Sequence, residues 1–196
     1  MEIALSQPVS DTEPDIALVR RLAAGDEEAL RLLYAAYGRR LLAYALRLTG
    51  SPALAEEVLQ DSLLAAWQGA RSFRGEGRPI AWLLGIVHHQ ALNATRRKQL
   101  PILELDEALA APAKTPLPEA HTEAMERQQA LARGLQKLSP EHRAVLDLIF
   151  FQGLTLAEAA QVCDCPLGTI KSRLSYAKAH LAGHLSREGV QAEDLR

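Results

Sequence analysis

Helical periodicity is the feature that most constrains how this chain of 196 residues can fold. In two segments, apolar residues recur every three or four positions, a spacing that places them on one face of an α-helix. The first stripe comprises Leu30, Leu33, Tyr34, Tyr37, Leu41, Tyr44 and Leu48, and the second comprises Val58, Leu59, Ser62, Leu63, Ala66 and Trp67. No segment shows the alternation or the β-branched enrichment of a strand. The sequence therefore predicts an all-α protein.

Helix boundaries can be placed from residues that start or stop helices. Gly50-Ser51-Pro52 ends the first long helix, and another helix begins near Pro79. In the C-terminal part, Ser139 precedes Pro140 and Glu141, the order expected of an N-cap followed by a first turn. A further helix is expected over residues 15–24.

A proline-containing segment divides the chain. Four of the ten prolines lie within residues 99–118, together with acidic residues and little helical periodicity. Proline fixes φ and removes a backbone donor, so this segment is predicted to be a flexible, extended linker. The predicted organisation is an N-terminal tail (1–14), a helical domain (15–98), the linker, a second helical domain (119–185) and a C-terminal tail (186–196).

Charge is unevenly distributed, although the whole chain carries a formal net charge of only −2. Residues 71–98 contain six basic residues against one acidic residue, a local net charge of +5. Residues 101–130 contain two basic against six acidic residues, and residues 166–178 contain three basic residues and no acidic one. Two basic blocks that flank an acidic connector indicate two nucleic-acid surfaces. The alternative for each block is a solvated basic helix face.

Residues 155–181 have the pattern of a helix-turn-helix. Thr155 and Glu158 form a capping box at the start of a short helix over residues 156–162. Asp164, in the turn that follows, tolerates the left-handed conformation that a sharp turn needs. A second helix begins at Pro166 and presents hydrogen-bond donors: Thr169, Lys171, Ser172, Arg173, Tyr176 and Lys178. This layout is typical of a helix that enters the major groove. The alternative is an αα-hairpin with a solvated basic face.

Enzyme, metal and membrane functions find little support in the sequence. Cys163 and Cys165 lack the second ligand pair of a structural zinc site, so we expect them to pack as small apolar residues. No nucleophile, base and orienting acid form a catalytic constellation. The longest uncharged stretch, residues 80–95, is too short to span a bilayer, and the first residues do not resemble a signal peptide. We expect a cytoplasmic protein with no catalytic residue, no metal and no cofactor.

Two motifs resemble one known family. The run PLGTIKSRLSYAKAHL, preceded by GLTLAEAAQVCDC, resembles the C-terminal promoter-reading region of bacterial sigma factors of the extracytoplasmic-function (ECF) group. Independently, AEEVLQDSLLAAWQ and then SFRGEGRPIAWLLGIVHHQALNATRR resemble the N-terminal helical domain of that group. The two resemblances occur in the family's order and cover the chain except for both tails and the linker.

The resemblance implies an alternative sigma factor that directs core RNA polymerase to promoters and opens the DNA strands. The donors between Thr169 and Lys178 would contact the −35 element. Glu57, Gln60 and Asp61 match positions that bind the clamp helices of the largest polymerase subunit. The residues expected at the −10 element, for recognition and melting, are Arg71, Phe73, Arg74, Arg78, His88, His89, Asn93, Arg96 and Arg97. Cationic and aromatic side chains suit a single strand because they hold phosphates and stack on bases.

The resemblance also implies partners. Besides promoter DNA and the clamp helices, these are the flap of the second-largest polymerase subunit and an anti-sigma factor, often membrane-bound. The family commonly has an Arg-Asn pair at His88-His89 and an aspartate at Asn93, so the −10 sequence cannot be transferred from relatives. We expect both histidines to be exposed and solvated, the alternative being pH-sensitive binding.

Two other functions remain open from the sequence. One is a dimeric helix-turn-helix repressor, which would need no polymerase and no strand-melting loop. The basic block between Arg71 and Arg97 argues against it. The other is a decoy that only sequesters an anti-sigma factor, and the donors Lys171, Ser172 and Arg173 argue against that.

Overall fold

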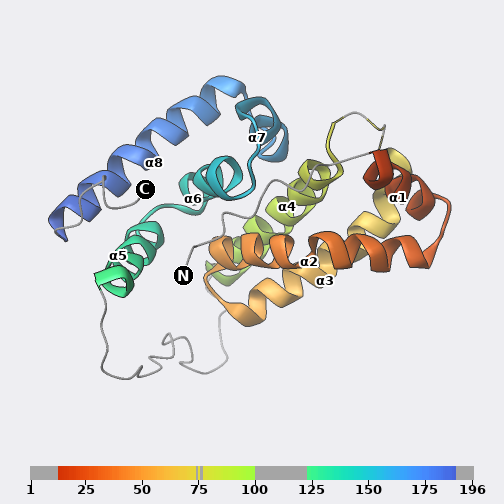
Figure 1. Ribbon diagram of the computed structural model, residues 1–196, viewed down its shortest axis with the longest axis horizontal. Coiled ribbons are helices and arrows are strands. Elements are labelled where there is room, and N and C mark those ends of the chain that lie inside the picture. The colour runs from red at the N-terminus through yellow and green to blue at the C-terminus, as the bar shows by residue number, and fades with distance from the viewer. Residues whose placement is uncertain (1–12, 74, 76, 100–122, 189–196) are drawn as a thin grey trace.

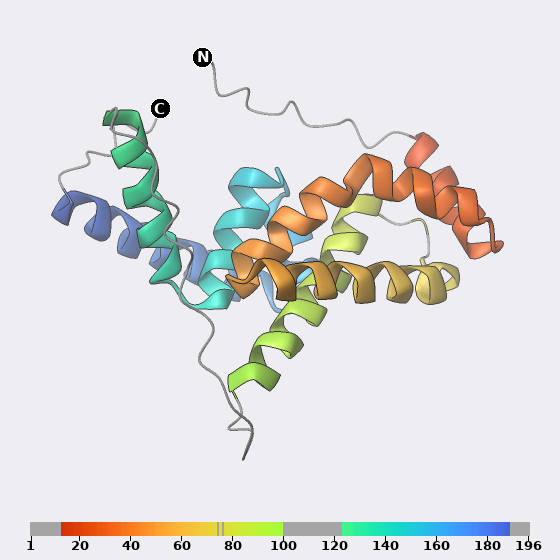
Figure 2. The same cartoon turned by 90° about the horizontal axis from the view of Figure 1, so that it is seen from below.

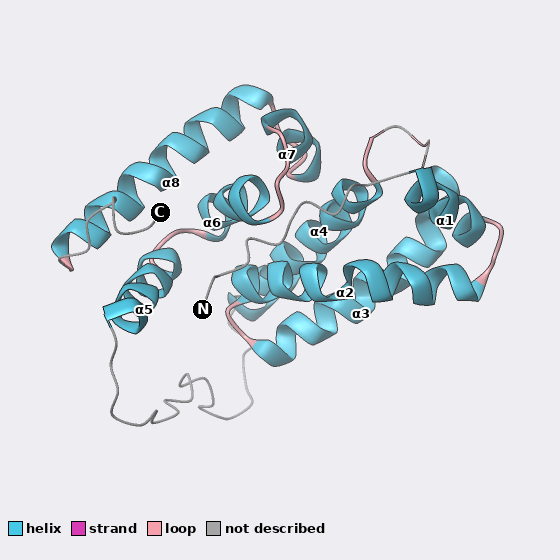
Figure 3. Ribbon diagram, in the orientation of Figure 1, coloured by secondary structure: helices cyan, strands magenta, loops and turns pink. Residues whose placement is uncertain are grey.

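The described part of the protein is entirely helical (Figures 1 and 3). The computed structural model describes residues 13–73, 75, 77–99 and 123–188. Its elements are α1 (Glu13–Ala23), α2 (Glu27–Thr49), α3 (Pro52–Gly69), a 3-10 helix (Ala70–Ser72), α4 (Pro79–Gln99), α5 (Glu123–Gln136), α6 (Pro140–Leu146), a π-helical turn (Asp147–Phe151), α7 (Leu156–Val162) and α8 (Leu167–Arg187). The prediction of an all-α fold is confirmed. Within these residues no helix is both long and apolar enough to cross a membrane.

In the N-terminal half (residues 13–99), α2 ends and α4 begins where the sequence predicts, and α1 lies within two residues of the predicted range. Gly50, with a φ of 68°, ends α2 and donates its backbone N–H to the carbonyl of Leu46. Ser51 caps α3, with Pro52 at the first turn. α2, α3 and α4 pack against one another, as the two views show (Figures 1 and 2). The predicted stripe on α2 faces this core except for Tyr34, which lies at the edge of the stripe and is 52% exposed.

The C-terminal half (residues 123–188) contains the predicted helix-turn-helix. The hydroxyl of Thr155 accepts the backbone N–H of Glu158, and the Glu158 carboxylate accepts the backbone N–H of Thr155. Asp164 has a φ of 46°, as expected for the sharp turn between α7 and α8. Inward-facing Ile170 and Ala177 of α8 are fully buried. The π-helical turn after α6 was not predicted, because the apolar run around it resembles an ordinary helix.

The two halves pack directly on each other. α4 contacts α7, and α2 contacts α6 (Figure 1). Buried residues from both halves, including Leu84, Leu148 and Val162, form one continuous hydrophobic cluster. The predicted linker, apart from Gln99 at the end of α4, and most of both predicted tails lie outside the described residues. α1 begins at Glu13 and α8 continues to Arg187, inside the predicted tails.

Candidate nucleic-acid interface

The outer face of α8 is exposed. Lys171, Ser172, Tyr176 and Lys178 all lie on the surface, and Thr169 is half-buried. The Ser172 hydroxyl donates to the backbone carbonyl of Thr169 at 3.0 Å, one turn back along the helix. No acidic side chain occurs within residues 166–178, so this face offers donors without a competing anion from its own helix. It has the length and chemistry of a helix that enters the major groove.

Arg173 differs from its neighbours because it turns toward the rest of the protein. It is half-buried, and its Nη1 lies 3.9 Å from the sulfur of Cys165 in the preceding turn. Its charge also reaches Glu141. Burial raises the pKa of Glu141, but two hydrogen bonds and then the Arg173 charge lower it, and the pKa lies below its ordinary value. The structure therefore separates Arg173 from the exposed donors of α8.

Tyr176 lies between two histidines. Its ring centroid is 4.5 Å from that of His142 on α6 and 5.9 Å from that of His180 on α8. Burial lowers the pKa of His142, and the nearby Arg173 charge lowers it further. The ring of Tyr176 nevertheless remains 56% exposed. An aromatic side chain held in place by two neighbouring rings loses little freedom when it contacts a base.

The cysteines of the turn pack as the sequence predicts. Cys163 and Cys165 are both half-buried free thiols that pack against the main hydrophobic cluster. Burial raises the pKa of the Cys163 thiol to about 12, with the neighbouring Cys165 adding to the effect. Among the residues described, no group of three His, Cys, Asp or Glu side chains could hold a metal ion.

The described residues that the sequence assigns to the −10 element lie on the 3-10 helix, in the loop before α4 and on α4. Arg71 lies in the 3-10 helix, where its Nε donates to the backbone carbonyl of Ala23 at 3.3 Å. His89, Asn93, Arg96 and Arg97 are exposed along α4. Arg74, which the sequence assigns to the same surface, lies outside the described residues. The exposed cations of this set therefore lie on the 3-10 helix and on the second half of α4.

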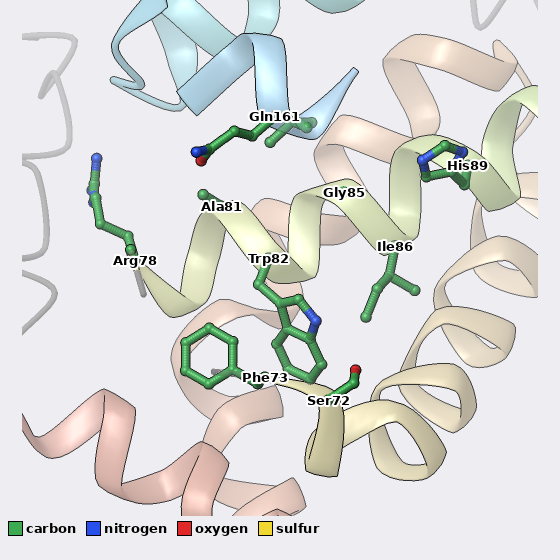
Figure 4. Close-up of a pocket in the computed structure, with 11 residues that line it drawn as sticks. Ser72, Phe73, Arg78, Ala81, Trp82, Gly85, Ile86, His89 and Gln161 are labelled. Carbon is green, nitrogen blue, oxygen red and sulfur yellow. The ribbon is translucent and has the colours of Figure 1, made fainter. Parts of the chain in front are cut away.

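A cavity of about 430 Å³ lies beside the start of α4 (Figure 4). Phe73 and Trp82 line it and pack against each other, with ring centroids 5.3 Å apart. In Figure 4 these two rings point to one side of α4, whereas Ala81 lies on the side that faces Gln161 of α7. Phe73 is half-buried against the core, so only part of its side chain is accessible.

His88 contradicts the expectation of an exposed, solvated histidine. It is only 2% exposed, and its Nδ1 lies 2.8 Å from the Tyr44 hydroxyl. Burial lowers the pKa of His88 to about 4, and the charges of His89 and Arg173 lower it further, whereas Glu141 opposes the shift. The sequence could not distinguish adjacent histidines, but α4 turns one inward and leaves His89 outside. In this conformation His88 cannot contact DNA.

The predicted polymerase contacts and part of the predicted −10 surface share one groove. Glu57 and Asp61 of α3 line it together with Asn93 and Arg97 of α4. Gln60 is exposed on the same helix as the two acids. The sequence assigned these groups to different partners, and the fold places carboxylates and a guanidinium on opposite walls.

Sequence reasoning missed a set of polar residues between the two halves. Arg47 of α2 pairs with the buried carboxylate of Asp147 at the π-helical turn. Arg40 donates to the backbone carbonyl of Gln152 at 3.1 Å, and Arg143 to that of Arg47 at 2.7 Å. The available clue was Asp147 itself, a lone acid within an otherwise apolar run.

Known proteins resemble both halves of the chain. Residues 33–100 match the family Sigma-70 region 2, and residues 128–181 match Sigma-70, region 4. The ECF RNA polymerase sigma factor SigL of Mycobacterium tuberculosis is 33% identical over 176 residues, which cover 89% of this chain and 99% of that protein. SigM of the same organism is 33% identical over 169 residues, covering 86% of this chain and 83% of that protein.

Solved structures agree with this relationship. The sigma factor RpoE of Bartonella quintana, solved with the anti-sigma factor NepR, superposes with a TM-score of 0.61 at 28% identity, covering 80% of this chain and 96% of that one. CnrH, solved with the cytosolic domain of CnrY, shares the fold with a TM-score of 0.66 at 23% identity, covering 89% and 99%. The two regions occur in the family's order, and the similarity extends over nearly the full length of the relatives. This chain therefore belongs to the ECF group of RNA polymerase sigma factors, which act in promoter-specific transcription initiation.

Proposed function

We propose that this protein binds core RNA polymerase, recognises a −35 element through α8, and recognises and opens a −10 element through its N-terminal half. The observation that supports this most strongly is the exposed, acid-free donor face of α8 in a chain of the ECF group. Lys171 and Lys178 would contact phosphates, and Ser172 and Tyr176 would contact the backbone or base edges. Half-buried Thr169 would join them. Arg173 is also assigned to this set, but its side chain would have to turn away from Cys165 to reach DNA.

Strand opening is assigned to the loop before α4 and to α4 itself. Replacing base stacking and pairing by protein contacts requires cations near phosphates and flat groups near bases. Arg71, Arg96 and Arg97 supply exposed charge, and we assign Arg74 and Arg78 to the same task. His89 and Asn93 lie on the same helix, in place of the family's usual residues. Phe73 would stack on a base only through the part of its ring that Trp82 and the core leave accessible.

Core polymerase would bind the exposed polar side of α3. Glu57, Gln60 and Asp61 all face solvent there, as a docking surface requires. The clamp helices of the largest subunit are the proposed partner of this side, and the flap of the second-largest subunit is the proposed partner of the C-terminal half. Binding free energy would drive strand separation, and no covalent chemistry by this chain is involved.

An anti-sigma factor is the proposed negative regulator. RpoE of Bartonella quintana, which shares 28% identity and the fold, was solved with the anti-sigma factor NepR. We propose that a comparable partner binds this chain and prevents polymerase from reaching it.

Run-off transcription on fragmented genomic DNA tests the proposal. Core RNA polymerase is assayed with and without the protein, and the transcript starts are mapped. We expect new transcripts that share a pair of upstream elements. Duplex binding without core, together with no new transcript, would instead favour a repressor. Binding of an anti-sigma factor with neither activity would favour a decoy.

A further inference from the structure

The turn before α8 carries two free thiols that the proposed function does not use. Cys163 and Cys165 are both half-buried, and only Asp164 separates them. Asp164 has a φ of 46°, in the left-handed helical region. A residue with helical dihedral angles of either hand leaves the Cα atoms of its two neighbours about 5.5 Å apart, which a disulfide can span. The backbone of the turn is therefore compatible with a bond between the two sulfurs.

The two thiols have different surroundings. Cys163 packs against the main hydrophobic cluster, where burial raises its pKa to about 12; the neighbouring Cys165 adds to this shift and the Arg173 charge opposes it. Cys165 also lines an open hollow of about 420 Å³ at the surface, together with Gln161 and Pro166. A small oxidant in solution can therefore reach Cys165 first, while Cys163 stays protonated against the core.

Arg173 of α8 places a positive charge beside Cys165. Its Nη1 donates to the Cys165 sulfur at 3.9 Å. Within the described residues, Arg173 makes no other hydrogen bond and no ion pair. Partial exposure beside a cation is the environment in which cysteines react with oxidants. The same contact holds the guanidinium of Arg173 away from the exposed donors of α8.

We propose that Cys163 and Cys165 form a redox-active dithiol, which a peroxide converts to a disulfide, and that this oxidation releases Arg173 to contact DNA. Closing the bond draws the Cys165 sulfur toward Cys163 and out of contact with Arg173, which then has lost its hydrogen-bond acceptor. The effect on DNA rests on the proposed function, because it concerns the α8 surface assigned there to the −35 element. The oxidation itself does not depend on that assignment.

The oxidation takes place in two steps. The Cys165 sulfur attacks one oxygen of hydrogen peroxide, so that an S–O bond forms, the O–O bond breaks and water leaves; the product is a sulfenic acid. The Cys163 sulfur then attacks the Cys165 sulfur, so that the S–S bond forms and the S–O bond breaks. The departing hydroxyl takes the thiol proton of Cys163 and leaves as water. Both thiols are oxidised, and the peroxide is reduced.

The first test follows the thiols of the full chain by mass spectrometry. The reduced protein is treated with hydrogen peroxide and then with an alkylating reagent. We expect both cysteines to be linked and protected from alkylation until a dithiol reductant is added. Cys163→Ala should stop at the sulfenic acid of Cys165, which a cyclic 1,3-diketone traps. Cys165→Ala should leave Cys163 as a thiol, because Cys163 is the protonated member of the pair.

The second test measures the release of Arg173 on a fluorescent pool of random duplexes of about 30 base pairs. We expect the oxidised protein to bind about threefold more tightly at low salt, with a plot of log affinity against log salt that is steeper by about 0.9, the value for one more phosphate contact. Arg173→Ala should bind equally in the reduced and oxidised states, because it has no guanidinium to release.

Variants of the thiols provide matched controls for this measurement. Cys165→Ala removes the sulfur and should bind like the oxidised protein without any oxidant, whereas Cys165→Ser keeps an acceptor for Arg173 and should bind like the reduced protein. Peroxide also oxidises Met1 and Met125. Cys163→Ala contains the same methionines and cannot form the disulfide, so peroxide should not raise its affinity.

Three outcomes decide the inference. A disulfide together with tighter duplex binding that requires Arg173 supports it. Two thiols that remain open to alkylation after peroxide treatment overturn the dithiol, and a disulfide without tighter binding, or with the same gain in Arg173→Ala, overturns the release of Arg173. Failure to transcribe with core polymerase would overturn the proposed function alone, because oxidation and duplex binding are measured without polymerase.

Discussion

The two proposed DNA surfaces are built differently. The surface on α8 is one helix face whose residues are close in sequence and largely exposed. The surface on the N-terminal half combines the loop before α4 with α4 itself, and the C-terminal half covers part of it. A helix face depends on local periodicity, whereas an assembled surface depends on every element that packs beside it. Residue roles on α8 therefore follow from the local sequence, whereas those on the N-terminal half also depend on which elements pack together.

The largest predicted effect concerns His88, the buried member of the N-terminal surface. Because its pKa is about 4 when folded and about 6.5 when unfolded, the unfolded state binds more protons between these values. Stability is therefore full above about pH 6.5 and falls toward pH 4, by about 3 kcal/mol in all. His88→Gln should remove most of this slope, as measured by urea unfolding from pH 7 to pH 4.5.

The neighbouring histidine provides the control for this measurement. His89→Gln changes an exposed ring and should leave the slope nearly unchanged. An unaltered slope in His88→Gln would show that His88 is not buried as a neutral ring, which would contradict its place inside the N-terminal half.

The next effect concerns the α8 surface. Arg173→Ala should weaken −35 recognition by about 1–3 kcal/mol if the guanidinium makes a bidentate base contact. Competition binding with promoter and altered-promoter duplexes measures this difference for holoenzyme. Lys178→Ala should weaken binding to all duplex sequences alike, because it removes a phosphate contact. A change of only a few tenths of a kcal/mol for Arg173→Ala would remove it from the base-reading set.

A smaller effect concerns the cap that orients α7. Thr155→Ala should lower the free energy of unfolding by about 1 kcal/mol, because the backbone N–H of Glu158 loses its acceptor. Thr155→Ser retains an acceptor and should recover most of the loss. Equal destabilisation by both changes would contradict the role of the cap. Chemical denaturation of the unaltered protein and of the two variants measures these free energies of unfolding.

The smallest effect concerns the closest approach of the halves. Gly85→Ala should raise the free energy of unfolding by about 0.5–1 kcal/mol, because alanine favours helix and its β-carbon fits at ordinary contact distance. Gly85→Leu should not share this gain, since a larger side chain meets α7. If leucine stabilised as much as alanine, the halves would not be closely packed in solution.

The sequence predicted local structure better than contacts between distant segments. The end of α2 at Gly50, the capping box at Thr155 and the left-handed Asp164 all follow from residue chemistry within a few positions, and all are confirmed. The inward turn of His88 and the pairing of Arg47 with Asp147 depend on packing between helices far apart in sequence. Periodicity alone does not specify which helices meet.

Permanganate footprinting shows whether the N-terminal half melts the promoter while the C-terminal half recognises it as a duplex. On an identified promoter, Arg71→Ala and Arg74→Ala are compared with Arg173→Ala, measuring closed complexes by band shift at low temperature and open complexes by thymine reactivity. We predict that the first two variants lose open complex more than closed complex, whereas Arg173→Ala loses both in proportion. Equal loss of closed and open complexes in all three variants would contradict the assignment of melting to the N-terminal half.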